Sequence, residues 1–271
     1  MKLQNVTCYS DAHTNARPLL NRLNLSIEDS EWLSIVGRNG SGKYTLAKLL
    51  SGIIAPAEGM ITSGHSDGGP IPYVMQEDYP FIGETAWEEL IFALESRGEP
   101  AYRIADTAHS ILQQTGLTHL MHQPLKELSG GQRQLVAAAC CLACRAPMLI
   151  FDEAVSMLDS ASQELVLRLA RQLHQSGTTI VWLTHQLSEV ADGDRVAVME
   201  DGRIAYEGTT ADFFYGASPR QANIATPCEQ AGFEPPYPVR IALHLLRSGT
   251  DLKQYPLTAS QLSEVLNHHE R

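Results

Sequence analysis

The most specific chemical motif in the chain is a glycine-rich run at residues 37–43, which reads Gly37-Arg38-Asn39-Gly40-Ser41-Gly42-Lys43. Glycines let successive backbone N–H groups turn toward one anion, and a following helix adds the positive end of its dipole. Lys43 adds a point charge for the outer phosphates. Because the run lies between a predicted strand and a predicted helix, it is predicted to be a phosphate-binding loop. The alternative is a glycine-rich turn with an unrelated lysine.

The residue after Lys43 departs from this motif. A Ser or Thr is expected there because its short hydroxyl binds Mg²⁺, but the chain has Tyr44. A phenol oxygen lies a whole ring further from the backbone, and Thr45 is turned by about 100° around the helix. We therefore predict weakened or altered Mg²⁺ coordination. In the alternative, water replaces the missing ligand and activity only falls.

Two carboxylates follow a continuous apolar run. Residues 148–151 are Met-Leu-Ile-Phe, and Asp152 and Glu153 come next. Such a run is typical of a buried parallel strand, and the carboxyl ends of these strands line the ligand crevice of open α/β sheets. Asp152 suits Mg²⁺, directly or through water, and Glu153 is placed to polarise an attacking water. The alternative is an acidic loop after a buried strand.

The run Leu128-Ser129-Gly130-Gly131-Gln132 is the third chemical feature. It predicts the start of a helix, capped by Ser129, that runs to about residue 143. Glycines at a capped helix start make a second N-terminus suited to an anion. An ordinary cap before a core helix has the same pattern.

Short β-type runs alternate with helical runs around these motifs. The predicted strands cover residues 3–9, 23–28, 32–36, 148–152 and 178–184, with a hairpin at 195–200 and 203–207. The predicted helices cover residues 44–50, 85–95, 101–115, 129–143, 160–175, 239–248 and 260–268. The turn-rich segment 55–72 is expected to hold at most short strands. This alternation predicts an α/β fold with a mostly parallel sheet and antiparallel strands at its edge.

Composition narrows the classes of function. The 271 residues include 20 Lys and Arg against 31 Asp and Glu, a formal net charge of −11, which is unsuited to coating nucleic acid. No run approaches the roughly 18 apolar residues of a membrane span, and the first ten residues lack a signal pattern, so we expect a cytosolic chain without a span. Cys140, Cys141 and Cys144 are expected to be reduced, small buried residues of a helix–sheet contact.

The phosphate loop, the run at 128–132, the strand ending in Asp152 and Glu153, and His185 occur in the order found in ATP-binding-cassette (ABC) ATPases. The chain resembles this family over about residues 1–215. Tyr73-Val74-Met75-Gln76 is similar to the family's glutamine loop, and Ser156-Met157-Leu158-Asp159 to the loop after its catalytic acids. Segments 40–50, 84–94, 153–159, 202–208 and 235–266 look most like the A component of energy-coupling-factor (ECF) transporters, which import vitamins and transition-metal ions.

The resemblance implies a role for each candidate residue. ATP is sandwiched between the phosphate loop of one subunit and the signature run of another, so Ser129 and Gly131 would serve the partner's nucleotide. Glu153 would be the catalytic base and His185 would contact the γ-phosphate, although a lone His after a strand is usually structural. Tyr9 would stack on adenine, although it could also be an ordinary strand aromatic. Asp152 and Gln76 would help to hold Mg²⁺ and water, and Asp159 would communicate across the dimer. The remaining nucleotide contacts would come from residues 37–43, Tyr44 and Thr45.

The resemblance also implies an organisation and a set of partners. Residues 1–215 would form the ABC ATPase domain, with an antiparallel β subdomain and a helical subdomain at about 77–145, and residues 216–271 a helical appendage for dimerisation. The segment after Gln76, with Trp87 and Phe92, would bind a helix of a membrane partner, although these aromatics fit a core equally. The expected partners are a second ABC ATPase subunit, a copy or a relative, together with a transmembrane coupling protein and a substrate-binding membrane protein. The chain would lie on the cytoplasmic side of the cell membrane and bind no nucleic acid.

Three hypotheses of function follow. The leading one is an ATP-hydrolysing subunit that powers uptake of a vitamin or transition-metal ion. A non-transport ABC ATPase that acts on DNA or ribosomes would be expected to carry coiled coils, tandem cassettes or basic extensions, and the acidic balance opposes it. The third hypothesis, suggested by Tyr44, is a nucleotide-binding subunit with weak hydrolysis that is paired with an active partner.

Overall fold

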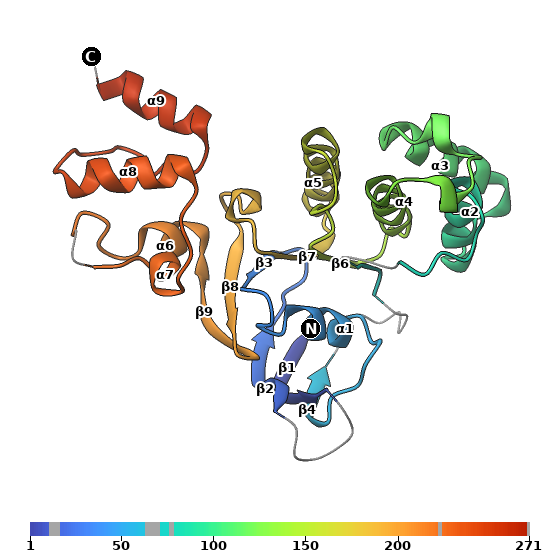
Figure 1. Cartoon of the computed structure of the whole chain (residues 1–271), viewed down its shortest axis with the longest axis horizontal. Helices are drawn as coiled ribbons and strands as arrows, with labels where there is room; N and C mark the ends of the chain where they lie inside the picture. Colours follow the sequence, from blue (N-terminus) through green and yellow to red (C-terminus); the bar gives the residue numbers. More distant parts are fainter. Residues whose placement is uncertain (11–16, 63–70, 76–78, 222–223, 270–271) are drawn as a thin grey trace.

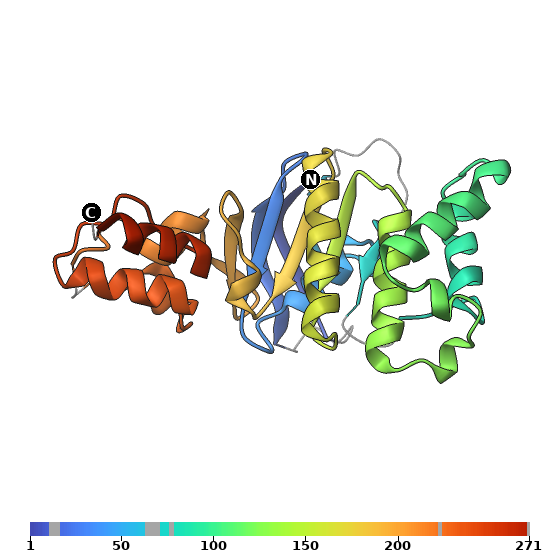
Figure 2. The ribbon, with the colours of Figure 1, turned by 90° about the horizontal axis from the view of Figure 1, so that it is seen from above.

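The computed structural model describes residues 1–10, 17–62, 71–75, 79–221 and 224–269. An α/β core occupies the middle of an elongated molecule, with a small antiparallel sheet beside it (Figure 1). A helical subdomain lies at one end and the C-terminal helices lie at the other (Figure 2). Within the described ranges, no helix is long and apolar enough to cross a bilayer. The predicted α/β architecture is confirmed.

The core is a six-stranded sheet in the order β5-β6-β7-β3-β8-β9. In this order, neighbouring strands from β5 through β6, β7 and β3 to β8 pair in parallel, and β9 pairs antiparallel with β8. β3, β6 and β7 are buried along their whole length, which explains why apolar residues predominate in all three. The strand bounds are β3 (Trp32–Val36), β5 (Tyr73–Val74), β6 (Met148–Asp152), β7 (Thr179–Thr184), β8 (Arg195–Glu200) and β9 (Arg203–Thr209).

The carboxyl ends of these parallel strands deliver three of the predicted motifs to one edge of the sheet. The phosphate loop leaves β3, Glu153 follows β6 and His185 follows β7. β7 lies between β3 and β6 in the sheet. The topology therefore brings motifs that are far apart in the sequence to one crevice.

A three-stranded antiparallel sheet, in the order β2-β1-β4, lies beside the core. Its strands are β1 (Lys2–Tyr9), β2 (Pro18–Ser26) and β4 (Glu58–Thr62), and its side chains share a core with α1 (Lys43–Leu50). β2 begins at Pro18, earlier than the predicted start at residue 23. The reason is local, because Arg22 has a φ of 48° and the pairing register shifts along β1 and β2, which hides the two-residue alternation.

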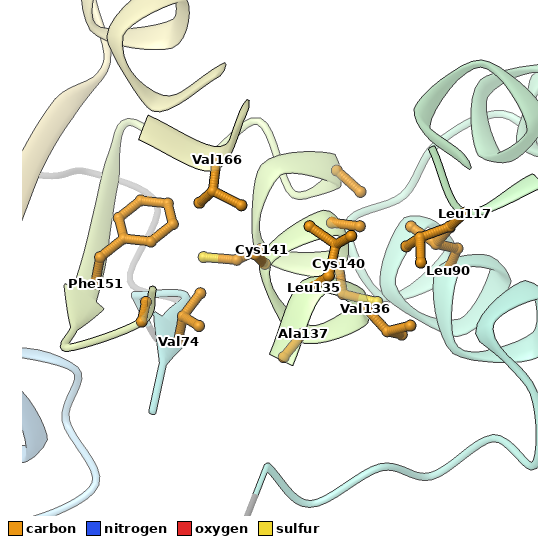
Figure 3. Packing of buried hydrophobic residues seen from close by; sticks show 14 of the residues in the cluster. Val74, Leu90, Leu117, Leu135, Val136, Ala137, Cys140, Cys141, Phe151 and Val166 are labelled. Carbon is orange, nitrogen blue, oxygen red and sulfur yellow. The ribbon is translucent and has the colours of Figure 1, made fainter. Parts of the chain in front are cut away.

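Helices cover both faces of the central sheet, with α5 (Ser160–Gln175) on the face opposite α1 (Figure 1). The helical subdomain consists of α2 (Ala86–Ser96), α3 (Ala101–Gln114) and α4 (Gly130–Ala143), with short turns η1 (Thr118–Leu120) and η2 (Leu125–Glu127). Figure 3 shows α4 side chains between Leu90 of α2 and Phe151 of β6. Cys140 and Cys141 are buried in this contact, as predicted for small residues between a helix and a sheet, whereas Cys144 is only partly buried because it lies at the end of α4.

The C-terminal helices are α6 (Thr210–Tyr215), α7 (Pro227–Gln230), α8 (Tyr237–Arg247) and α9 (Ala259–His269). The predicted cap before α9 is present, since the Gln261 N–H donates to Thr258 Oγ1 at 3.3 Å and the Thr258 N–H donates to Gln261 Oε1 at 3.1 Å. Side chains of α6 and α8 share one core with Val36 of β3 and Val198 of β8. The appendage is therefore built onto the strand that leads into the phosphate loop. The division at residue 215, where α6 ends, stays a prediction.

Candidate functional site

The phosphate loop turns from β3 into α1 through two left-handed glycines. Gly40 has a φ of 80° and Gly42 a φ of 105°, a region that a residue with a Cβ rarely adopts. A Cβ on Gly42 would also lie 2.8 Å from the Leu19 carbonyl oxygen. Among the described residues, no side chain caps α1 at Gly42. The first N–H groups of the helix are thus left for a ligand, as a phosphate loop requires.

Neighbouring backbone fixes the shape of this loop. The Gly202 N–H, in the turn between β8 and β9, donates to the Ser41 carbonyl oxygen at 2.9 Å. A Cβ on Gly37 would lie 2.7 Å from the Met199 carbonyl oxygen. The Ser41 hydroxyl is buried and has no hydrogen-bond partner within the part of the chain that the structure describes. Such atoms are rare, and a phosphate oxygen would satisfy this one.

Lys43 is buried with its ammonium group held over the loop. Its Nζ donates to the carbonyl oxygens of Gly37 at 2.7 Å and Arg38 at 3.4 Å. The same nitrogen lies 3.5 Å from Oε1 of Glu153. Carbonyl oxygens and one carboxylate thus hold the cation where a phosphate would compete for it.

Glu153 and His185 meet at the same place. Glu153 has a φ of 47°, a conformation that costs about 1–2 kcal/mol for an L-residue, and its N–H donates to the Leu183 carbonyl oxygen of β7 at 2.9 Å. His185 Nδ1 lies 3.2 Å from Glu153 Oε1. One carboxylate oxygen therefore faces both Lys43 and His185. Gln76, the third predicted catalytic residue, lies outside the described residues.

Asp152 is buried beneath the crevice and hydrogen-bonded to a residue that sequence reasoning missed. The Tyr73 hydroxyl donates to Asp152 Oδ2 at 2.8 Å. Burial raises the pKa of Asp152 to about 6, although the hydrogen bond from Tyr73 and the charge of Lys43 oppose this rise. Burial and the neighbouring Asp152 also raise the pKa of Tyr73. The sequence signal for Tyr73 was its place in the strand before Gln76.

Position 44 does not fit a Mg²⁺ ligand. The Tyr44 side chain is 51% exposed, and Lys48 Nζ lies 4.1 Å from the centroid of its ring, so an ammonium group already occupies this aromatic face. Thr45 is buried on α1. A magnesium ion beside the loop would find the Asp152 carboxylate but no short hydroxyl at position 44.

The predicted signature residues belong to a different part of the molecule. Ser129 caps α4, which lies in the helical subdomain apart from α1 (Figure 1). The Gln132 N–H donates to Ser129 Oγ at 3.2 Å, and the Ser129 N–H donates to Gln132 Oε1 at 2.8 Å, a reciprocal capping box. A Cβ on Gly131 would lie 3.0 Å from the Met157 carbonyl oxygen. The structure therefore does not bring Ser129 and Gly131 to the chain's own phosphate loop.

Two more predicted residues lie at the ends of elements. Tyr9 is the last residue of β1, half-buried and paired with Pro18 of β2, and its contact with adenine stays a prediction. Asp159 is the N-cap of α5, where its Oδ1 accepts the N–H groups of Ala161 and Ser162 at 3.1 and 3.0 Å. Hydrogen bonds from Ser162 lower the pKa of Asp159, which favours the carboxylate that a helix N-terminus prefers.

Two side-chain contacts near the site were not predicted. Arg38 Nη2 donates to the Gly232 carbonyl oxygen at 2.7 Å, which joins the phosphate loop to the C-terminal appendage. Glu189, at the end of η3 (Leu187–Glu189), is a buried carboxylate that accepts the Trp182 Nε1–H at 2.7 Å. The Arg38 contact has no local sequence signal. For Glu189, the signal available was its place one helical turn after His185.

Comparisons with known proteins agree with this geometry. The ABC transporter family model matches residues 20–156. The energy-coupling factor transporter ATP-binding protein EcfA1 of Halalkalibacterium halodurans is 34% identical, over 97% of this chain and 95% of that protein. The protein of the same name from Bacillus licheniformis is 35% identical, over 92% of this chain and 90% of its own length.

Solved structures give the same result for the fold. The dimeric ATP-binding cassette MJ0796 bound to ADP and Pi has a TM-score of 0.67 and 27% identity, over 77% of this chain and 97% of that one. CbiO1 of Clostridium perfringens, described as part of the ABC transporter complex cbiONQ, has a TM-score of 0.64 and 27% identity, over 79% of this chain and 89% of that one. The chain therefore belongs to the ABC transporter family, as one of its ATP-hydrolysing cassettes.

Proposed function

We propose that this chain is the ATP-binding subunit of an ECF-type importer, which hydrolyses ATP to drive uptake of a vitamin or a transition-metal ion. The observation that carries the proposal is the assembly of Lys43, Glu153 and His185 at the phosphate loop. The capped start of the signature helix α4 lies in a different part of the molecule. The similarity to EcfA1 proteins over nearly the whole chain supports the importer type.

Within this proposal, each residue acts on the nucleotide or on the attacking water. Backbone N–H groups of the loop and Lys43 bind the phosphates, and His185 contacts the γ-phosphate. Glu153 takes a proton from water as the water oxygen attacks the γ-phosphorus and the bond to the β-phosphate oxygen breaks. Mg²⁺ would neutralise phosphate charge beside Asp152, with Gln76 as the other predicted ligand.

The proposed partners follow from the separation of the two surfaces. A second ABC ATPase subunit pairs head to tail, so that Ser129 and Gly131 contact its nucleotide and it supplies a signature in return. The appendage, where Tyr237 and Leu266 are exposed, adds to this dimer. Phe92 lines a groove of about 870 Å³ that takes a helix of the membrane partner, and the chain is thereby held at the cytoplasmic face of the cell membrane.

Purification through a tag on this chain tests the importer assignment. From membranes in mild detergent, we expect a second ABC ATPase and two membrane proteins to co-purify, and the reconstituted complex to take up solute with ATP. Lys43→Ala should abolish uptake, since binding of the outer phosphates depends on that charge. Recovery of the chain with no membrane protein, or with nucleic acid in a salt-sensitive complex, would contradict the assignment.

Tyr44 favours a second candidate, a subunit of this kind whose own site turns over slowly. The half-exposed ring beneath Lys48 offers no hydroxyl in the position that the family uses for Mg²⁺. Tyr44→Ser should then raise the ATPase rate of the chain about tenfold or more and make it dependent on Mg²⁺ concentration. Equal rates and equal metal dependence in the two proteins would refute the impairment.

A further inference from the structure

Glu189 is a buried carboxylate in the turn that carries His185. It is the last residue of η3, one helical turn after His185, and its exposed fraction is 9%. Burial raises the pKa of its carboxyl group. A buried carboxylate is costly unless it is hydrogen-bonded or paired with a charge. The contacts that hold it here come from β7 and from α5.

The carboxylate of Glu189 is anchored on β7. The Trp182 Nε1–H donates to its Oε2 at 2.7 Å, and the Thr184 side chain also lowers the pKa of its carboxyl group. Trp182 is fully buried and packs against Phe151 and Trp32, with ring centroids 5.0 and 5.5 Å away. The side chain of Glu189 thus ties the turn to the rigid centre of the sheet.

The backbone of Glu189 is anchored on α5. Arg171 Nη2 donates to its carbonyl oxygen at 3.3 Å, and Arg171 is itself paired with the buried Asp194. The Arg171 guanidinium also lies 3.4 Å from the centroid of the Trp32 ring. Both the side chain and the backbone of Glu189 are therefore held, the side chain by β7 and the backbone by α5.

Glu189 also lies within electrostatic range of the catalytic groups. Charge on the His185 ring lowers the pKa of the Glu189 carboxyl group, and the charge of Glu153 raises it. His185 Nδ1 in turn lies 3.2 Å from Glu153 Oε1. The imidazole is thus influenced by two carboxylates, one of which contacts it while the other fixes the turn on which it is carried.

We propose that Glu189 is a positioning residue for ATP hydrolysis, which holds the His185 turn against β7 so that the imidazole faces Glu153 and the γ-phosphate. This inference rests on the roles proposed above for His185 and Glu153, and it does not depend on the transported solute or on the membrane partners. A residue that serves only to satisfy the Trp182 N–H would have no effect on His185.

Two substitutions separate the anchor from the charge. Trp182→Phe keeps an aromatic ring and removes the N–H donor, whereas Glu189→Gln keeps an acceptor oxygen and removes the charge. Glu164→Gln, on the exposed face of α5, is the matched control. Folding of each variant is checked by thermal unfolding.

The first measurement is spectroscopic and needs no turnover. In the nucleotide-free chain, the ring resonances of His185 are identified by their loss in His185→Ala. We expect these resonances to shift in Glu189→Gln and in Trp182→Phe, and to stay in place in Glu164→Gln. Unmoved His185 resonances in folded Glu189→Gln would overturn the proposal, whatever the protein transports.

The second measurement is kinetic and uses the Tyr44→Ser background, in which the chain's own site is expected to turn over. Glu189→Gln should lower kcat about tenfold and change the KM for ATP less than about twofold, as expected when a transition-state interaction is lost. In a His185→Ala background the same substitution should have no further effect. An equal loss with and without His185 would overturn the proposal, whereas a Tyr44→Ser chain without any turnover would count against the proposed function and leave the spectroscopic result decisive.

Discussion

Two helix N-termini in this chain are predicted to bind phosphate, and they differ in their capping. At α1 the N-cap is Gly42, and no described side chain caps the helix. At α4 the cap is reciprocal, with the Ser129 hydroxyl and the Gln132 side chain each satisfying a backbone N–H. The start of α1 has no side-chain partner for its first N–H groups among the described residues, whereas the capping box at α4 satisfies the N–H groups of Ser129 and Gln132.

This difference in capping suggests different roles for the phosphate loop and for the signature run at the start of α4. The loop before α1 also has a buried lysine and a Ser41 hydroxyl with no hydrogen-bond partner among the described residues, which suits the phosphate binding proposed for it. The start of α4 is stable without a ligand, and Ser129 still has its hydroxyl proton to donate. Tyr44 lies on α1, next to Lys43 of the loop. The departure from the family's motif therefore lies at the phosphate loop, whereas the signature run at residues 128–132 matches the family's signature.

The largest expected contrast is in nucleotide affinity. Lys43→Ala should weaken ATP binding by the isolated chain about 30- to 150-fold, since it removes a charge-assisted contact of about 2–3 kcal/mol. Ser129→Ala should leave that affinity within about twofold, because Ser129 lies away from the chain's own phosphate loop and is proposed to serve another subunit's nucleotide. Fluorescent-nucleotide titration measures both, and a comparable loss in Ser129→Ala would show that the division is wrong.

The next contrast is between a glycine at each helix start. Gly42→Ala should lower the free energy of unfolding by about 2–3 kcal/mol, because Gly42 is left-handed and its Cβ would lie 2.8 Å from Leu19. Gly130→Ala should be neutral or stabilising by up to about 1 kcal/mol, since its Cβ would meet no described atom within 4 Å. Urea unfolding measures the free energy of unfolding of both variants, and an equal loss of stability at the two positions would refute this contrast.

Asp152 gives a pH-dependent contrast. Its pKa in the folded chain is about 6, above the value of about 3.9 for an unfolded aspartate. The group therefore stabilises the fold fully below about pH 4, and this stabilisation is lost as the pH rises through about 6.

Asp152→Asn keeps an acceptor for Tyr73 and removes the buried charge. At about pH 7.5 it should raise the free energy of unfolding by about 1–3 kcal/mol, and the gain should shrink toward zero near pH 4.5. Asp106→Asn, at an exposed position of α3, is the control. A gain of equal size at both pH values would mean that burial of charge is not its cause.

The smallest expected effect concerns the tie between the loop and the appendage. Arg38→Ala removes the hydrogen bond to the Gly232 carbonyl oxygen, which should cost about 0.5–1 kcal/mol. Amide hydrogen exchange around residues 228–233 should become a few-fold faster. Unchanged exchange in that segment would show that the contact does not restrain the appendage.

The sequence predicted the parts of the molecule that follow local rules. The apolar runs at β3, β6 and β7, the loop between β3 and α1, and the caps at Ser129 and Thr258 each depend on residues close together in the chain. The start of β2 was misplaced because the left-handed Arg22 interrupts its alternation.

The long-range contacts around the site could not be predicted from the sequence, for a physical reason. Tyr73 and Asp152 meet because β5 and β6 are paired, and Arg38 meets Gly232 because the appendage packs on the end of β3. Such contacts are set by the packing of whole elements, and no local pattern encodes them. The Trp182–Glu189 hydrogen bond is shorter in range, but it depends on the path of the turn after His185.

The central proposal that follows from Tyr44 is that this chain supplies a working signature to its partner while its own site turns over slowly. The most direct test is the steady-state ATPase rate of the complex purified through this chain, with two variants compared side by side. Ser129→Arg should reduce the rate to less than about a tenth, because it blocks the surface that completes the partner's site, whereas Glu153→Gln should leave more than about half of it. An equally deep loss in both variants would contradict the claim, since it would show that the chain's own site carries the turnover as well.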